Sequence, residues 1–485
     1  MQLDARRRWF ALMVLCLGVL MIVLDSTIVN VALPSIKQDL QFNDASLVWV
    51  VNAYLLTFGG FLLLGGRLGD LYGHRRLFLA GIVAFTLASL WCGLSSSQTE
   101  LVIARAVQGF GGAVVTSVAL SLIMMLFHEP ADRAKAMGVY GFVCAGGGSV
   151  GVLLGGLLTS ALDWHWIFLV NIPIGAIVFF LCLRLLPGGS GHAAGGKLDV
   201  AGAVTVTVGM MLAVYAIVGG NEAGWTSPTT LGLLAAAIVL LGVFLVIEAR
   251  VREPLMPLSM FKLRNVATAN VVGVLWAAAM FAWFFLSALY MQLVLGYGPM
   301  QVGLAFLPAN LIMAAFSLGL SAKIVMRFGI RGPLAVGLLL AAAGLACFAA
   351  APVAGDFTTH VLPGMVLLGI GAGLAFNPVL LAAMSDVSPA DSGLASGLVN
   401  TSFMMGGALG LAVLASLASA RTASLQAAGA DAVTALNGGY HVAFVIGAAC
   451  AASAALIGWV VIRVRTPVTD SHGAGLPAGD QAAVE

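Results

Sequence analysis

Asp25 is the residue whose type and position point most directly to chemistry. It lies within an apolar run at residues 9–32, which is long enough to span a bilayer. A charged side chain at that depth costs about 3 kcal/mol to insert, so such residues usually have a function. Ser26 and Asn30 share its helical face, which predicts a polar lining to a cavity. We interpret Asp25 as a proton carrier; the alternative is a structural hydrogen-bonding hub.

Arg105 is a second ionisable residue within an apolar run, at residues 101–126. Gln108 shares its helical face, as do Gly109, Gly112 and Thr116. If successive runs cross the membrane in alternate directions, the rise of 1.5 Å per residue places Arg105 near the depth of Asp25. We therefore expect the two to pair or compete, with protonation of Asp25 freeing Arg105. The alternative is an arginine that extends to the outer interface.

An aromatic stripe in the run at 266–292 is the candidate substrate surface. Trp276, Trp283 and Tyr290 recur every seven residues, and Met280 lies on the same face. Aromatic and thioether groups suit lipophilic or cationic substrates, although a stripe facing lipid or another helix has the same pattern. The remaining candidate contacts are polar residues of other runs: Ser26, Asn30, Gln108, Asn310, Asn377 and Asn400.

The elements that must position these residues are membrane helices. The 485-residue chain is 61% hydrophobic and 9% charged, whereas soluble domains are about 25% charged. We expect an all-α integral membrane protein with fourteen transmembrane helices. The predicted spans are 9–32, 47–66, 77–95, 101–126, 136–160, 165–186, 200–219, 230–249, 266–292, 300–322, 332–351, 359–383, 394–419 and 441–462.

The basic residues predict the orientation of these helices. Nineteen of the 22 Lys and Arg residues fall in the loops and tails on the N-terminal side. By the positive-inside rule, both termini are then cytoplasmic. Asp25 is the only acid that this arrangement leaves in the hydrocarbon. The six cysteines lie in apolar runs without paired spacing, so we expect neither a disulfide framework nor a metal site.

An internal repeat predicts two similar halves. Residues 66–75 and 322–331 both carry a small residue, a glycine seven positions later and an arginine two after that. Both lie on the same predicted side, which is typical of parallel repeats. We expect a six-helix half at 1–186, a linker with two extra helices at 187–265 and a second six-helix half at 266–465. A disordered cytoplasmic tail would follow at 466–485.

Four passages resemble one family, the fourteen-helix drug:proton antiporters of the major facilitator superfamily. The passage from Leu24 to Pro34 is similar to the first-helix signature, and Gly66 to Arg76 to the loop motif between helices two and three. Residues 105–112 resemble the fourth-helix motif. Gly141 to Gly156, with the passage from Trp164 to Gly175 that follows, resembles the antiporter fifth helix and its continuation.

The loop motif implies an inner gate. In the family this motif closes the cytoplasmic side, which implies a gate made of Gly66, Asp70, Gly73, Arg75 and Arg76. A carboxylate at Asp70 can pair with Arg75 or Arg76, or accept bonds at a helix N-terminus. The alternative is a solvated turn. Leu71 stands where the motif usually carries a basic residue.

Helix packing is expected along the fifth run. Gly147, Gly151 and Gly155 recur at four-residue intervals, and small residues at this spacing let helices approach closely. Gly148 and Val152 stand where the family usually carries prolines.

We predict a proton-coupled antiporter that exports small hydrophobic or cationic drugs or antibiotics across the cell membrane. The resemblance to the family implies that this is the bacterial inner membrane. The proton gradient is its energy source, without a cofactor. Gly191 to Lys197 lacks the Ser or Thr of a P-loop, which argues against ATP. We expect a monomer that is neither an enzyme nor a nucleic-acid-binding protein. The alternatives are export of a lipid or endogenous metabolite, and a non-transporting membrane sensor.

Overall fold

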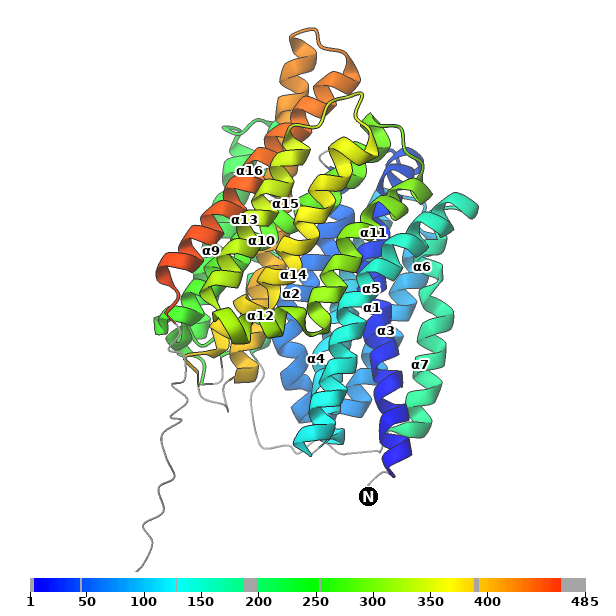
Figure 1. Cartoon of the computed structure of the whole chain (residues 1–485), viewed down its shortest axis with the longest axis vertical. Helices are drawn as coiled ribbons and strands as arrows, with labels where there is room; N and C mark the ends of the chain where they lie inside the picture. The colour runs from blue at the N-terminus through cyan, green and yellow to red at the C-terminus, as the bar shows by residue number, and fades with distance from the viewer. Residues whose placement is uncertain are drawn as a thin grey trace, which may run out of the picture.

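The chain folds as a bundle of long helices (Figure 1). A computed structural model describes residues 4–43, 46–127, 129–186, 199–252, 254–387 and 392–463, and these ranges contain no strand. The linker at 187–196 and the tail at 466–485 lie outside the described residues. The helices of the first part are α1 (Ala5–Asp39), η1 (Ser46–Val48), α2 (Trp49–Tyr72), α3 (His74–Leu94), α4 (Gln98–Leu126), α5 (Pro130–Ala161), α6 (Trp166–Leu169) and α7 (Asn171–Leu185).

Two helices follow these, and then a second set. The pair is α8 (Val200–Ala223) and α9 (Pro228–Arg250). The second set is η2 (Leu258–Lys262), α10 (Arg264–Leu289), η3 (Tyr290–Val294), α11 (Pro299–Ala315), η4 (Phe316–Leu320), α12 (Ser321–Phe328), α13 (Arg331–Ala349), η5 (Phe357–Val361), α14 (Leu362–Met384), α15 (Ser392–Ala427) and α16 (Ala432–Val461).

The number of membrane spans is the first point at which the structure differs from the sequence prediction. All fourteen predicted runs fall on helix, but twelve of the described helices are long and apolar enough to cross a membrane. The other two runs, 136–160 and 300–322, lie on α5 and on α11 to α12, whose described apolar stretches are 150–161 and 299–315. The count of fourteen is therefore not confirmed.

The two sets of helices meet along two seams. Helix α2 packs against α15, and α5 packs against α11. The pair α8 and α9 packs together, and α8 lies against both α2 and α15. At the first seam the buried Asn52 donates from Nδ2 to the Ala408 carbonyl at 2.8 Å. The described ends of the chain at residues 4 and 463 lie toward the same end of the bundle (Figure 1).

The glycines of α5 lie against α1, the helix that carries Asp25. A β-carbon on Gly151 would lie 2.9 Å from the Leu24 carbonyl oxygen, and one on Gly155 would lie 2.7 Å from that of Ile28. Gly147 lies against Leu20 and Val23 of the same helix. The close approach predicted from the spacing is therefore present, and it holds α5 against the part of α1 that carries Asp25.

Gly151→Ala is expected to destabilise the protein by about 1–3 kcal/mol, because the added methyl group overpacks this contact. Thermal unfolding in detergent measures the change. Gly232→Ala in α9 is the matched control, since nothing lies within 4 Å of its β-carbon position. The control should be neutral or stabilised by up to about 1 kcal/mol. Equal stability of the two variants would contradict the role of Gly151.

The motif at 66–76 is helical over most of its length, so the expectation of a loop from Gly66 is wrong. Helix α2 continues to Tyr72, Gly73 has φ of 94°, and α3 begins at His74. Asp70 is in the last turn of α2, and its side chain lies outside the described part of the structure. The turn is compact because one glycine with positive φ joins the two helices.

The two copies of the repeat make equivalent bonds. Arg75 donates to the Leu183 carbonyl at 2.6 Å, near the end of α7. In the second copy Gly329 has φ of 72°, and Arg331 donates from Nε to the Trp459 carbonyl at 3.1 Å, near the end of α16. Each arginine thus binds free carbonyls at the C-terminus of the last helix of its own half. Among the described bonds, Arg75 links α3 to α7 within one half.

Candidate functional site

Asp25 and Arg105 form a buried ion pair. Arg105 donates to Asp25 Oδ2 at 2.5 Å, and each residue is 1% exposed. The Arg105 Nε also donates to the Val50 carbonyl at 2.9 Å. The predicted pairing is therefore confirmed, and extension of Arg105 to the interface is wrong, because its guanidinium is enclosed by protein.

Three amide and hydroxyl groups complete the network around the carboxylate. Gln108 accepts from Arg105 at 2.6 Å and donates from Nε2 to Asp25 Oδ1 at 2.6 Å and to Ser89 Oγ at 2.8 Å. Asn171 donates to Asp25 Oδ1 at 3.0 Å. The Ser89 hydroxyl donates in turn to the Phe85 carbonyl at 2.8 Å. Asp25 is thus held and oriented by charge-assisted bonds from α4 and α7.

Two of these partners could not be chosen from the sequence. Asn171 is the first residue of α7, and Ser89 lies in the middle of α3. The sequence offered one indication: Asn171 is a polar residue inside an apolar run, within the passage that resembles the antiporter motif. That signal does not reveal which helix faces α1. Only the packing of α7 and α3 around α1 and α4 brings the groups together.

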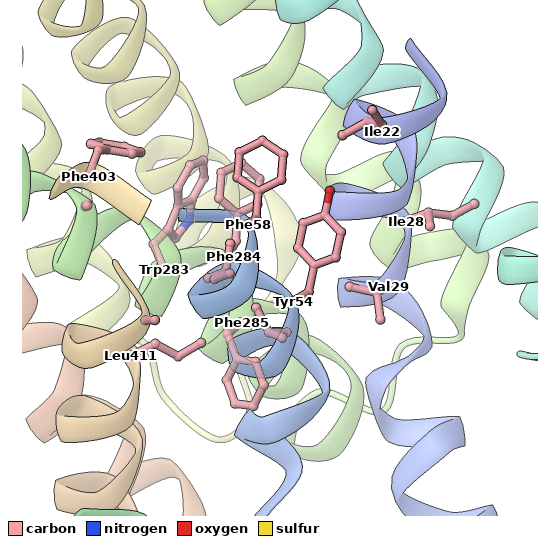
Figure 2. Close-up of a cluster of buried hydrophobic side chains, with 14 of the residues drawn as sticks. Ile22, Ile28, Val29, Tyr54, Phe58, Trp283, Phe284, Phe285, Phe403 and Leu411 are labelled. Atoms are coloured by element: carbon pink, nitrogen blue, oxygen red, sulfur yellow. The ribbon is translucent and has the colours of Figure 1, made fainter. Parts of the chain in front are cut away.

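Aromatic rings cover the guanidinium of Arg105. Its Cζ lies 4.4 Å from the centroid of the Tyr54 ring and 5.6 Å from that of Phe168. Both distances suit cation–π attraction. The Tyr54 hydroxyl is directed toward α1 in Figure 2 and has no partner among the described residues. Tyr54, which the sequence analysis missed, therefore closes one side of the ion pair.

An aromatic cluster continues from Tyr54 toward the second half. The Tyr54 and Phe58 rings of α2 stack with centroids 5.7 Å apart. Phe58, Trp283 and Phe284 belong to one buried cluster (Figure 2). Phe284 stacks on Phe306 of α11 at 5.5 Å. Rings from both halves thus belong to the buried core beside the ion pair.

The predicted aromatic stripe divides in the structure. Trp276 and Trp283 are buried, and neither indole N–H meets an acceptor among the described residues. Met280 is half-buried. Tyr290 instead donates to the Pro352 carbonyl at 2.9 Å and packs edge-on against Phe348, so its contacts lie within the second half.

The polar candidates have separate surroundings. Ser26 donates to Val23, Asn30 to Ser26 and Thr27, and Asn400 to Ser396, in each case to a carbonyl of their own helix. Asn310 is buried, and its Nδ2 has no partner in the described part of the chain, whereas Asn377 is half-buried. Among the predicted polar lining, only Gln108 binds Asp25 in the described bonds.

Asn171→Ala is expected to cost about 1.5–3 kcal/mol of stability, since it removes a hydrogen bond to a charged group. Thermal unfolding in detergent measures it. Asn437→Ala is the control, because Asn437 is also buried but donates to a neutral carbonyl, that of Ala351, at 3.1 Å. The control should lose about 0.5–1.5 kcal/mol. A smaller loss at Asn171 than at Asn437 would contradict the assigned bond.

A bundle of membrane-length helices in two halves, with a buried ion pair beside their interface, is the architecture of a membrane transporter. The chain belongs to the Major Facilitator Superfamily, whose family model matches residues 15–411. It is a multi-pass membrane protein, and the members of this family that it matches are transporters.

Several resistance and export proteins are similar over most of their length. The puromycin resistance protein pur8 of Streptomyces alboniger is 38% identical over 473 residues, which cover 96% of this chain and 94% of that protein. The cephamycin export protein CmcT of Amycolatopsis lactamdurans is 39% identical over 420 residues, 86% of each chain. The multidrug resistance protein Stp of Mycobacterium tuberculosis is 35% identical over 409 residues, 83% of this chain and 74% of that one.

Solved structures show the same fold. A bacterial homologue of the human lysosomal transporter Spinster, inward-facing and unoccupied, superposes with a TM-score of 0.65 at 18% identity, covering 94% of this chain and 97% of that chain. An auto-inhibited peptide transporter of the POT family gives 0.66 at 17% identity, covering 97% and 99%.

Proposed function

We propose that this protein is a proton-coupled antiporter that exports small hydrophobic or cationic antibiotics from the cell. The observation that carries the proposal is the Asp25–Arg105 ion pair, a titratable group enclosed by protein at the edge of an aromatic cluster. The relatives named for antibiotic resistance and export support the substrate class. The basic loops support cytoplasmic termini and fourteen crossings, with α5 and α11 as the remaining two.

Proton uptake by Asp25 changes the energy of the whole network. Protonation removes the charge that Arg105 and Gln108 hold, and it leaves the buried guanidinium without its counter-ion. A buried unpaired charge costs several kcal/mol, so Arg105 must gain another partner or water. This penalty favours a rearrangement that opens the site. Release of the proton on the cytoplasmic side restores the pair.

Substrate binding is assigned to the aromatic cluster next to that pair. Phe58, Trp283 and Phe284 offer flat apolar surfaces. The Trp283 N–H has no acceptor among the described residues, so a substrate with an acceptor group could bind it. Tyr54 touches both the cluster and Arg105, so a substrate that moves its ring also disturbs the ion pair. Rotation of the two halves along the α2–α15 and α5–α11 seams would then expose the site to the outside.

The test uses everted membrane vesicles with an imposed proton gradient. Addition of a transported antibiotic, with puromycin first in the panel, should release protons from the vesicle lumen and load the compound. Vesicles without the protein are the control. Loading without proton release would contradict antiport. Loading of lipids or metabolites alone would favour an endogenous substrate, and no loading of any compound would favour a sensor.

A further inference from the structure

A second pair of acids lies outside the site described above. Asp199 precedes the first turn of α8, and Glu248 lies in the last turn of α9. Both belong to the helix pair inserted between the halves, and they are only 5% and 3% exposed. Acidic side chains are almost never so buried unless they are paired.

Each acid uses one oxygen to hold the backbone. Asp199 Oδ1 accepts from the Gly202 N–H at 2.7 Å and caps α8. Glu248 Oε2 accepts from the Met256 N–H at 2.9 Å and fastens the segment after α9. The other two oxygens, Asp199 Oδ2 and Glu248 Oε1, are enclosed and have no partner among the described residues.

The two free oxygens face the same small space beside Gly202. A β-carbon on Gly202 would collide with Asp199 Oδ2 and would lie 2.9 Å from Glu248 Oε1. Both carboxyl groups therefore face the position that a β-carbon of residue 202 would occupy. The carboxyl groups are close enough to repel strongly if both are ionised.

The surroundings supply no compensating charge in the described part of the chain. The described apolar neighbours are Leu64 of α2, Ala203 next to Gly202 and Leu255 of the following segment, with Phe61 and Leu68 of α2 packed against them. The described basic residues at the end of α9, Arg250 and Arg252, have exposed side chains. Arg421, the one charged residue of α15, lies toward the opposite end of that helix.

We propose that Asp199 and Glu248 share one proton and form a proton-binding site separate from Asp25. The Glu248 Oε1–H donates to Asp199 Oδ2, so the pair carries a single negative charge. The charge belongs on Asp199, which lies at the positive N-terminal end of α8, and the proton on Glu248, which lies at the negative C-terminal end of α9. A hard metal ion requires about six oxygens, and this space offers two.

The shared proton links three segments, and we call this Asp199–Glu248 linkage the clasp. It joins the start of α8 to the end of α9, and through the Met256 N–H it holds the connection that leads to η2 and α10. Loss of the proton places two negative charges in an apolar space, which drives Glu248 out and frees the connection. The clasp therefore joins the inserted pair to the first helix of the second half only while it is protonated.

Infrared spectroscopy of the full chain in lipid nanodiscs tests the proposal directly. At neutral pH the wild-type spectrum should contain the carbonyl-stretch band of a protonated carboxyl group. This band should weaken in Glu248→Gln and in Asp199→Asn, and it should persist in Asp25→Asn. Glu222→Gln is the matched control, because the Glu222 carboxylate at the other end of α8 accepts from Asn43 and is exposed. A band unchanged in both Glu248→Gln and Asp199→Asn would overturn the proposal.

Hydrogen exchange gives a second readout that does not depend on transport. After correction for intrinsic rates, protection of the Met256 amide should fall about tenfold or more between pH 6 and pH 9 in the wild type. In Glu248→Gln the amide N–H₂ replaces the shared proton, so protection should not change with pH. If protection of the Met256 amide in the wild type did not depend on pH, the proposed role of the shared proton would be overturned. A failure of antibiotic export would leave both measurements unaffected.

Discussion

Asp25→Asn is expected to abolish the proposed antibiotic-dependent proton release while antibiotic binding persists. Asparagine has nearly the same shape as aspartate and can still accept a bond from Arg105, but it has no proton to exchange. Arg105 then remains beside a neutral group in every state, as it does transiently when Asp25 is protonated. We therefore expect proton release in everted vesicles to fall to the level of vesicles without the protein. Tryptophan fluorescence quenching should still report binding near Trp283.

Asp431→Asn is the matched control for this variant. Asp431 caps α16 by accepting from the Thr434 N–H at 3.0 Å, and asparagine caps a helix equally well. The bonds from Thr434 hold the pKa of the Asp431 carboxyl below its usual value, so this group is ionised throughout the pH range of transport. The control should transport like the wild type. Proton release that survives in Asp25→Asn would show that another group carries the proton.

The sequence was sufficient to predict the ion pair but not its surroundings. The depths of Asp25 and Arg105 follow from the rise of a helix and the alternation of spans, and these constraints hold whatever the packing. Which helices face the pair is a tertiary property. Asn171, Ser89 and Tyr54 come from three further helices, and no periodicity within one helix indicates which neighbour it will contact.

The predicted aromatic stripe is divided in the structure for a geometric reason. Residues seven apart drift by about 20° on a straight helix, so Trp276, Trp283 and Tyr290 do not share one line. The helix also changes to the wider π form at Tyr290, which turns that ring toward Phe348. The rings that contact Trp283 are Phe284 of its own helix and Phe306 of α11, with centroids 4.3 and 6.0 Å away.

The inner-gate motif shows a different limit of sequence reasoning. The apolar runs at 47–66 and 77–95 and the resemblance to the loop motif predicted a loop between them. Glycine is also a poor helix former in water. Within the bundle α2 remains helical to Tyr72, where Gly65 and Gly69 let it approach α4 and α3. Close helix packing, which small residues permit in membranes, outweighs the intrinsic preference.

Arg105→Ala is expected to be the most destabilising single change, at about 3–5 kcal/mol, because it leaves Asp25 as a buried and uncompensated charge. Combining it with Asp25→Asn should recover much of that loss, since no charge then remains at the site. Unfolding in detergent by SDS titration of the two single variants and the double variant measures the coupling between them. Arg421→Ala, at an exposed arginine of α15, should change stability by less than about 1 kcal/mol. If the double variant were as unstable as the sum of the two single variants, the ion pair would not be the source of the effect. The recovery is expected because the cost of breaking a buried pair comes mainly from the partner left behind, and here that partner is Asp25, the proposed proton carrier.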